Sequence, residues 1–129
     1  NPVMPPHYVT KDARVQNSMI TEGCDIAGHV DFSILFAGVT VEKGAVVHDS
    51  IVMPGSVIKA GAVVEYSIVA EDVVVGENAL VGCRPENMED KQNWGVTVIA
   101  KGIQIGKGAK VPAKAMIEKD VPEVSGDDE

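Results

Sequence analysis

The sequence has few of the residues from which reactive or metal-binding sites are built. Aromatic residues make up 4% of the chain, and the two cysteines, Cys24 and Cys83, form no Cys-x-x-Cys pair. A disulfide framework is therefore not indicated, and we expect buried thiols. The three histidines lack helical metal-ligand spacing, so we expect no metal site in this chain.

Other absences narrow the class of protein. The sequence has no run of eighteen apolar residues and no basic start followed by an apolar segment, which argues against a membrane span or signal peptide. A formal net charge of -8 disfavours binding to nucleic acid or to anionic membranes. No glycine-rich phosphate loop stands between a strand and a helix. We expect a cytoplasmic domain with no nucleotide site of its own.

A short phrase of sequence returns four times. The phrases begin at Val15, Val30, Val47 and Val64, so the spacing is nearly constant and only the first interval is shorter, by two positions. A period of about 17 residues, made of three near-hexads, is too short for a helical hairpin and is typical of one coil of a parallel β-helix. The shorter first interval predicts one shortened corner in the early coils.

The hexads predict which residues face the interior and which turn the corners. Branched aliphatic residues suit the flat faces, and glycines suit the tight corners. We expect the following side chains to point inward: Val41, Ala45, Val47, Ile51, Met53, Val57, Ile58, Ala62, Val64, Ile68 and Ala70. The corner glycines are expected at Gly38, Gly44, Gly55, Gly61 and Gly76.

Each phrase carries a serine in the same place. Stacking coils at roughly 4.8 Å would put Ser18, Ser33, Ser50 and Ser67 in one column. A serine nucleophile needs an activating base within reach, and none is evident. The column therefore predicts a structural ladder in which the hydroxyls bond to nearby backbone groups.

The hexads break at about residues 83–95, where a polar segment predicts one loop insertion outside the prism. Loops on rigid scaffolds often carry function. Arg84, Lys91 and Trp94 in this loop would suit an anion or a neighbouring domain, and a solvated insertion without a ligand is the competing interpretation.

Three further predictions concern domain limits and surface. Residues 1–10, with three prolines and Asn1 in place of Met, predict an extended linker from a missing upstream domain. Residues 11–124 are expected to form the β-helix domain, and residues 125–129 an acidic tail. Two interpretations stay open for Phe32, Phe36 and Tyr66. They form an exposed contact stripe for a partner, or the two phenylalanine rings are buried and the tyrosine is on the surface by chance.

The repeated phrases resemble those of one enzyme family. The likeness lies in Pro5-Pro-His-Tyr-Val9, in Thr21-Glu-Gly-Cys24, in Ser33-Ile-Leu-Phe36 and in Asp49-Ser-Ile-Val-Met-Pro54. These segments are similar to the C-terminal domain of bacterial glucose-1-phosphate adenylyltransferase. The resemblance implies a left-handed β-helix attached after a nucleotidyltransferase domain. It also implies that this chain is not catalytic alone.

The same resemblance implies a parent enzyme that makes ADP-glucose and pyrophosphate from ATP and glucose 1-phosphate for glycogen or starch synthesis. Magnesium and ATP are expected at the missing catalytic domain. Members of the family are tetramers regulated by anionic glycolytic metabolites, so we expect a homo- or hetero-oligomer and an anionic sugar-phosphate effector. The nearest matches to the family's effector-binding residues are Arg84 and Lys91. Two basic residues, where regulated members have several arginines, predict a weak anion site.

A second function is compatible with the hexads. A free-standing hexapeptide acyltransferase would trimerise, bind coenzyme A and use a histidine as general base towards a hydroxyl or amine. His29 and His48 are the candidates for that base. A solvated corner residue without a catalytic role is the simpler interpretation of either histidine.

Overall fold

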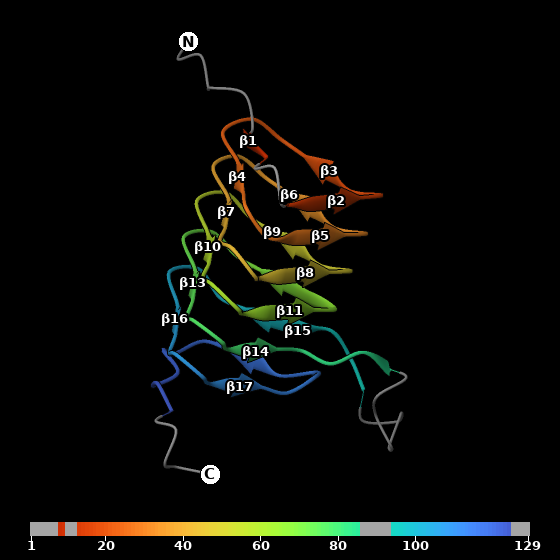
Figure 1. Cartoon of the computed structure of the whole chain (residues 1–129). Coiled ribbons are helices and arrows are strands. Elements are labelled where there is room, and N and C mark those ends of the chain that lie inside the picture. The colour runs from red at the N-terminus through yellow and green to blue at the C-terminus, as the bar shows by residue number, and fades with distance from the viewer. Residues whose placement is uncertain (1–7, 10–12, 86–93, 125–129) are drawn as a thin grey trace.

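The structure, a computed structural model, describes residues 8–9, 13–85 and 94–124. Three parallel sheets of six short strands stand around one axis, and each coil of the chain contributes one strand to each sheet (Figure 1). We name the sheets faces A, B and C. The fold is the predicted parallel β-helix.

The strands of each face follow in coil order. Face A consists of β1 (Tyr8–Val9), β4 (Asp25–Ile26), β7 (Thr40–Val41), β10 (Val57–Ile58), β13 (Val74–Val75) and β16 (Gln104–Ile105). Face B consists of β2 (Arg14–Gln16), β5 (His29–Asp31), β8 (Val46–His48), β11 (Val63–Glu65), β14 (Leu80–Val81) and β17 (Lys110–Val111). Face C consists of β3 (Met19–Ile20), β6 (Ile34–Leu35), β9 (Ile51–Val52), β12 (Ser67–Val69), β15 (Thr97–Ile99) and β18 (Met116–Ile117). Strand β1 lies inside the range 1–10 assigned to the linker, so the first sheet begins before residue 11.

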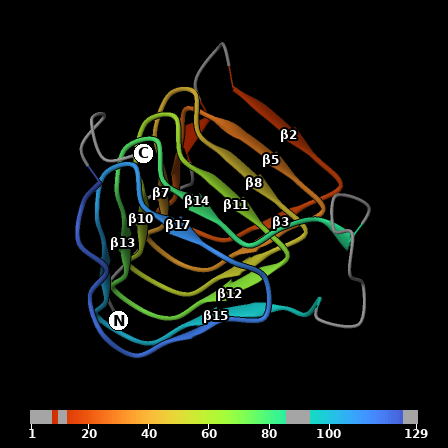
Figure 2. The same cartoon turned by 90° about the horizontal axis from the view of Figure 1, so that it is seen from below.

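The hand of the coil is visible along the axis. In Figure 2 the chain passes clockwise from β13 through β14 to β15 while it approaches the viewer. This path is left-handed, as the resemblance implied, and opposite to the usual hand of connections between parallel strands.

One corner is shortened, as the spacing predicts. Val30 pairs with Val15 in the coil before and with Val47 in the coil after, so the first of these coils is shorter by two positions. The difference falls between β4 and β5, which only Ala27 and Gly28 connect. A Cβ atom on Gly28 would lie 2.4 Å from the carbonyl oxygen of Ala45 and 2.7 Å from that of Glu42. Only glycine leaves room for the longer corner of the next coil.

The predicted insertion is present. Ile68 pairs with Ile51 in the coil before and with Val98 in the coil after, and the second interval is much the longer. The added segment lies between β14 and β15, and strand pairing resumes after it without a shift in register. Residues 86–93 of this loop lie outside the described residues.

Among the residues whose burial the structure describes, the hydrophobic core is a column of aliphatic side chains with Cys24 and has no aromatic member. Val41, Val47 and Val64 are fully buried, as predicted. On face C the prediction is wrong, because Val52 and Val69 are the buried residues there. The side chains wrongly assigned to the interior lie on face C, directly after its strands and at the start of β10 on face A, and all are partly exposed: Ile51, Met53, Val57, Ile68 and Ala70.

The error has a geometric cause. Inward positions advance by six from Val41 to Val47, by five from Val47 to Val52 and by six from Val52 to Ile58. The shorter step passes the corner between faces B and C, where Asp49 adopts φ of 50°. At the other corners glycine takes the left-handed conformation in several coils, for example Gly44 with φ of 80°, and Asp72 and Asn78 take it in the coil that contains β13.

Candidate functional site

The serine column is a hydrogen-bonded ladder along the corner between faces B and C. The backbone N–H of Ser50 donates to Ser33 Oγ at 3.1 Å, and that of Ser67 donates to Ser50 Oγ at 3.2 Å. Each hydroxyl donates in turn to a nearby carbonyl that precedes it in the same coil, as Ser50 Oγ does to His48 at 2.9 Å. The structural interpretation is confirmed, because these hydroxyl protons are already used.

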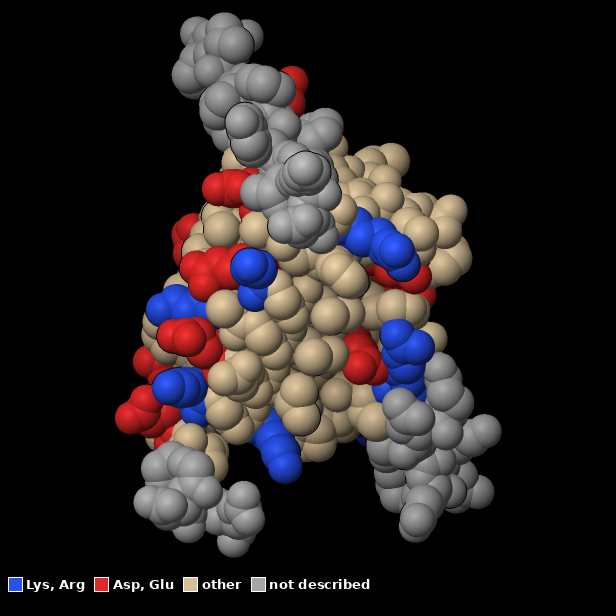
Figure 3. Space-filling view, in the orientation of Figure 1, with Lys and Arg blue, Asp and Glu red and all other residues tan. Residues whose placement is uncertain are grey.

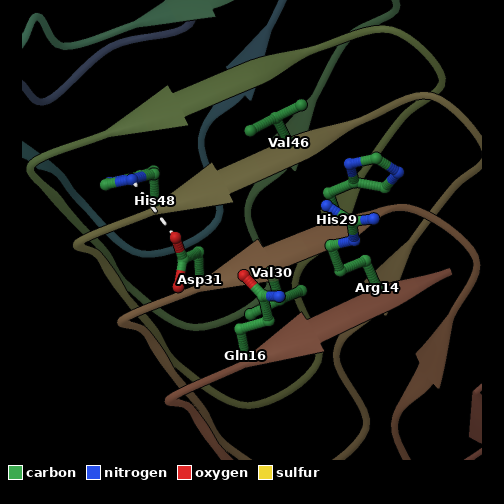
Figure 4. A pocket seen from close by; sticks show the side chains of 7 residues that line it. All are labelled: Arg14, Gln16, His29, Val30, Asp31, Val46 and His48. Atoms are coloured by element: carbon green, nitrogen blue, oxygen red, sulfur yellow. Dashed lines mark ion pairs between the residues drawn. The ribbon is translucent and has the colours of Figure 1, made fainter.

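A hollow of about 180 Å³ opens on face B across the first three coils. Figure 4 shows its lining side chains, which come from β2, β5 and β8: Arg14, Gln16, His29, Val30, Asp31, Val46 and His48. Neighbouring positions of successive strands meet here, since Arg14 pairs with His29 and Asp31 pairs with His48. The two histidines were predicted as candidates from the sequence, whereas Arg14 and Asp31 were assigned no role. Their only signal in the sequence is an offset of one coil from a histidine.

His48 is held between two carboxylates. Its Nε2 lies 3.5 Å from Asp31 Oδ2, drawn as a dashed line in Figure 4, and its Nδ1 contacts the carboxylate of Asp49. The Nδ1 contact lacks hydrogen-bond geometry, and Asp31 Oδ1 is buried without a partner among the described residues. Both ring nitrogens face acids rather than the open hollow, which is a poor arrangement for a general base that must reach a substrate.

His29 has different surroundings. It begins β5, and its side chain is exposed beside Arg14 on the neighbouring strand. The prediction that these histidines are corner residues is wrong, because both lie in strands of face B. Asp31 contacts His48 and orients its ring. Figure 4 shows His29 beside Arg14 and apart from the pair of His48 and Asp31.

Four rings follow the corner between faces B and C. Their centroids are separated by 6.4 Å from Phe32 to His48, 6.5 Å from His48 to Tyr66 and 5.4 Å from Tyr66 to Trp94. Phe32 is 57% exposed and Phe36 is 37% exposed. The interpretation of two buried phenylalanine rings is therefore wrong, and the contact-stripe interpretation is compatible with the geometry.

The ends of the insertion are fastened to the prism. Arg84 Nε donates to Glu65 Oε2 at 3.1 Å, and Trp94 Nε1 donates to the carbonyl oxygen of Cys83 at 2.6 Å. Trp94 also meets Tyr66 edge to face. Of the two predicted effector-binding residues, Arg84 lies at this fastening, and Lys91 lies outside the described residues.

The other sequence predictions concern thiols, metals and membranes. Cys24 is buried, as predicted, whereas Cys83 is partly exposed. Within residues 8–9, 13–85 and 94–124, no three His, Cys, Asp or Glu side chains are grouped to hold a metal ion. The same residues include no helix with the length and apolar character that crossing a membrane requires.

Comparison with known proteins identifies the family. Residues 5–105 match the family described as GlmU-like, C-terminal hexapeptide. The chain belongs to this hexapeptide family. Among solved structures, the acetyltransferase domain of PglB from Neisseria gonorrhoeae FA1090 is similar, with a TM-score of 0.60 and 19% sequence identity over 92% of this chain and 52% of that chain. At this identity the likeness concerns the hexapeptide fold alone.

Part of the chain is closer in sequence to several curated proteins. A stretch of 50 residues is 56% identical to a protein of Bacillus cereus (strain Q1) named glucose-1-phosphate adenylyltransferase. Proteins with the same name from Bacillus thuringiensis (strain Al Hakam) and Bacillus mycoides (strain KBAB4) are 54% identical over 50 residues. The stretch is 39% of this chain and 13% of each relative, so each relative is about three times as long as this chain. The resemblance stated from the sequence is confirmed.

Proposed function

We propose that this chain is the noncatalytic oligomerisation and regulatory β-helix of an enzyme that makes ADP-glucose and pyrophosphate from ATP and glucose 1-phosphate. The observation that carries the proposal is the 54% to 56% identity over 50 residues to proteins named glucose-1-phosphate adenylyltransferase. Magnesium and ATP act in the upstream catalytic domain of the parent, which works in the cytoplasm in glycogen or starch synthesis as a tetramer.

The contacts of the serine and histidine side chains in the described residues support a noncatalytic role. The hydroxyls of Ser33, Ser50 and Ser67 donate to backbone carbonyls inside the ladder. His48 lies between Asp31 and Asp49. A nucleophile with a free base beside it, which covalent catalysis needs, is not found among the described residues.

The test uses the full-length parent polypeptide. We expect it to release pyrophosphate from ATP and glucose 1-phosphate in the presence of magnesium, and to have the mass of a tetramer in light scattering. A truncated parent that lacks residues 13–124 is expected to lose the tetramer. A parent that forms no ADP-glucose would refute the proposed reaction, and an unchanged assembly after truncation would refute the oligomerisation role.

The effector site belongs to the same proposal. Arg84 and Lys91 bind an anionic sugar phosphate, and the anion must compete with the carboxylate of Glu65 for Arg84. This competition supports a weak site. Fructose 1,6-bisphosphate is expected to alter the rate of the parent only at high concentration, and the double variant Arg84→Gln, Lys91→Gln is expected to remove the effect. Lys101→Gln, an exposed lysine on another corner, is the matched control.

The fold likeness to an acetyltransferase domain favours one second candidate, a coenzyme A-dependent acyltransferase with His29 or His48 as base. The acids on both sides of His48 argue against His48 as that base, and His29 is the base that the candidate leaves. Isothermal calorimetry with coenzyme A distinguishes the two functions: binding would support the acyltransferase, and no heat of binding is expected for the adenylyltransferase domain.

A further inference from the structure

The outward positions of face C form one apolar column along the whole prism. Cα partners in register connect the six strands from β3 to β18. The six outward residues of this column are Met19, Ile34, Ile51, Ile68, Val98 and Met116. None of them is polar or charged, although the chain has 11 basic and 19 acidic residues.

The column widens into a patch, which we name the C patch. On one side the corner residues Phe32 and Val96 are 57% and 44% exposed, and on the other side Phe36 is 37% exposed. At the two ends Met19 and Met116 are 64% and 69% exposed. Single apolar residues on a surface are ordinary, but a contiguous patch of this extent marks an interaction site.

Face B shows that the outward apolar column is not a requirement of the fold. One outward column of face B begins with Arg14 and His29, continues with Val46, Val63 and Leu80, and ends at Lys110. The next column carries Asp31, His48 and Glu65. Figure 3, in the orientation of Figure 1, shows charged side chains along both margins of the view, on the left beside the strands of face A and on the right at the far ends of the strands of face B. Charge is therefore tolerated on the outside of these coils.

The size of the C patch selects its occupant. Six strands at about 4.8 Å and a width of four residues at about 3.3 Å give roughly 24 by 13 Å, or about 300 Å². Two copies of the patch would bury about 600 Å², less than the roughly 1,000 Å² that a specific interface between separate molecules needs. Contacts between domains of one chain begin at about 600 Å², because the linker holds the partner at a high effective concentration.

We propose that the C patch is the surface against which the remaining part of the same polypeptide packs, through an apolar face of its own. The inference rests on the proposed function, in which the catalytic part is carried by the parent. The relatives, about three times as long as this chain, provide a tethered partner of sufficient size. The outward column of face C offers no charged group for the partner to pair with, and Asp49, on the corner that also carries Phe32, already contacts His48.

The test compares two lysine substitutions in the full-length parent. Ile51→Lys puts a charge at the centre of the C patch, and Val63→Lys puts the same charge at the equivalent place on face B. We expect limited proteolysis between the two parts to be at least about tenfold faster for Ile51→Lys, because a charge cannot be buried there without a partner. Val63→Lys is expected to be cut like the wild type.

Three other outcomes are informative. Equal cleavage of both variants would overturn the proposal. If the β-helix released from Ile51→Lys is itself degraded, the variant Met116→Lys is used instead. The side chain of Met116 is 69% exposed, so it can be changed without unfolding the prism. A wild-type rate of cleavage for Met116→Lys would then overturn the proposal. An assembly smaller than that of the wild-type parent in light scattering, with wild-type cleavage, would assign the patch to a second copy and overturn the proposal. The readout is independent of ADP-glucose synthesis, so failure of the proposed reaction is seen separately.

Discussion

Val47 on face B and Val52 on face C lie in one coil, and both side chains are fully buried. Their neighbours on the outside differ: His48 next to Val47 meets two carboxylates, whereas Ile51 next to Val52 belongs to the C patch. The interior of the prism is therefore the same behind both faces, and only the exterior distinguishes them. The inward residues determine the β-helical fold, and the outward residues determine which partners the surface contacts.

The largest expected effect is on the shared interior. Val47→Asp and Val52→Asp each bury an unpaired carboxylate, so each is expected to destabilise the prism by at least about 4 kcal/mol. Urea unfolding followed by circular dichroism measures both. If only one of the two variants unfolds the protein, the faces do not share one interior and the comparison fails.

The next effect concerns the corner between the two faces. Ser50→Ala removes the acceptor of the buried Ser67 N–H and is expected to cost about 1–3 kcal/mol. Ser67→Ala is the matched control, because the next coil bypasses its hydroxyl: the N–H of Thr97 donates to the carbonyl of Tyr66. We expect a cost below about 1 kcal/mol for the control. Equal losses in urea unfolding would mean that the ladder does not connect the coils.

A smaller effect is expected from the ion pair on the outside of face B. Arg84 and Glu65 are 34% and 21% exposed, so solvent screens their attraction. Glu65→Gln is expected to cost less than about 1 kcal/mol. Glu71→Gln, at an exposed corner, controls for the loss of one negative charge. A loss well above that of the control and above this limit would show that face B depends on its outer charges.

The smallest effect on stability is expected from the outward substitutions themselves. In the isolated chain, Ile51→Lys and Val63→Lys are each expected to change the free energy of unfolding by about 0.5 kcal/mol, as surface substitutions usually do. The fluorescence of a hydrophobic dye separates them, because only Ile51→Lys interrupts the C patch. Equal dye binding by the two variants would remove the distinction between faces B and C.

Sequence spacing was sufficient to predict the coils, the shortened corner and the insertion, because register in a stacked prism follows the repeat length. The serine ladder was predictable for the same reason. Which residues of face C point inward could not be predicted, because Ile51 and Val52 are both aliphatic and hydrophobicity does not distinguish them. That ambiguity also concealed the C patch, because an outward column is recognised only once the inward one is assigned.

The contacts of His48 could not be predicted from the sequence, for a different reason. Asp49 is adjacent in the chain, but Asp31 reaches the ring only through the pairing of β5 with β8. Whether a ring nitrogen faces an acid or open solvent depends on side-chain angles, which spacing does not contain. The same limit applies to the pairing of Arg84 with Glu65, which lie in different coils.

Each strand of the prism pairs only with the strand one coil before it and the strand one coil after it. The cooperativity of such a structure is one-dimensional: the energy of each coil depends on itself and on its two contacts, and opening can begin at an end and advance coil by coil. A partner that lies along the C patch would touch all six coils at once. Packing against the parent would then convert a stack that frays from its ends into a single cooperative unit.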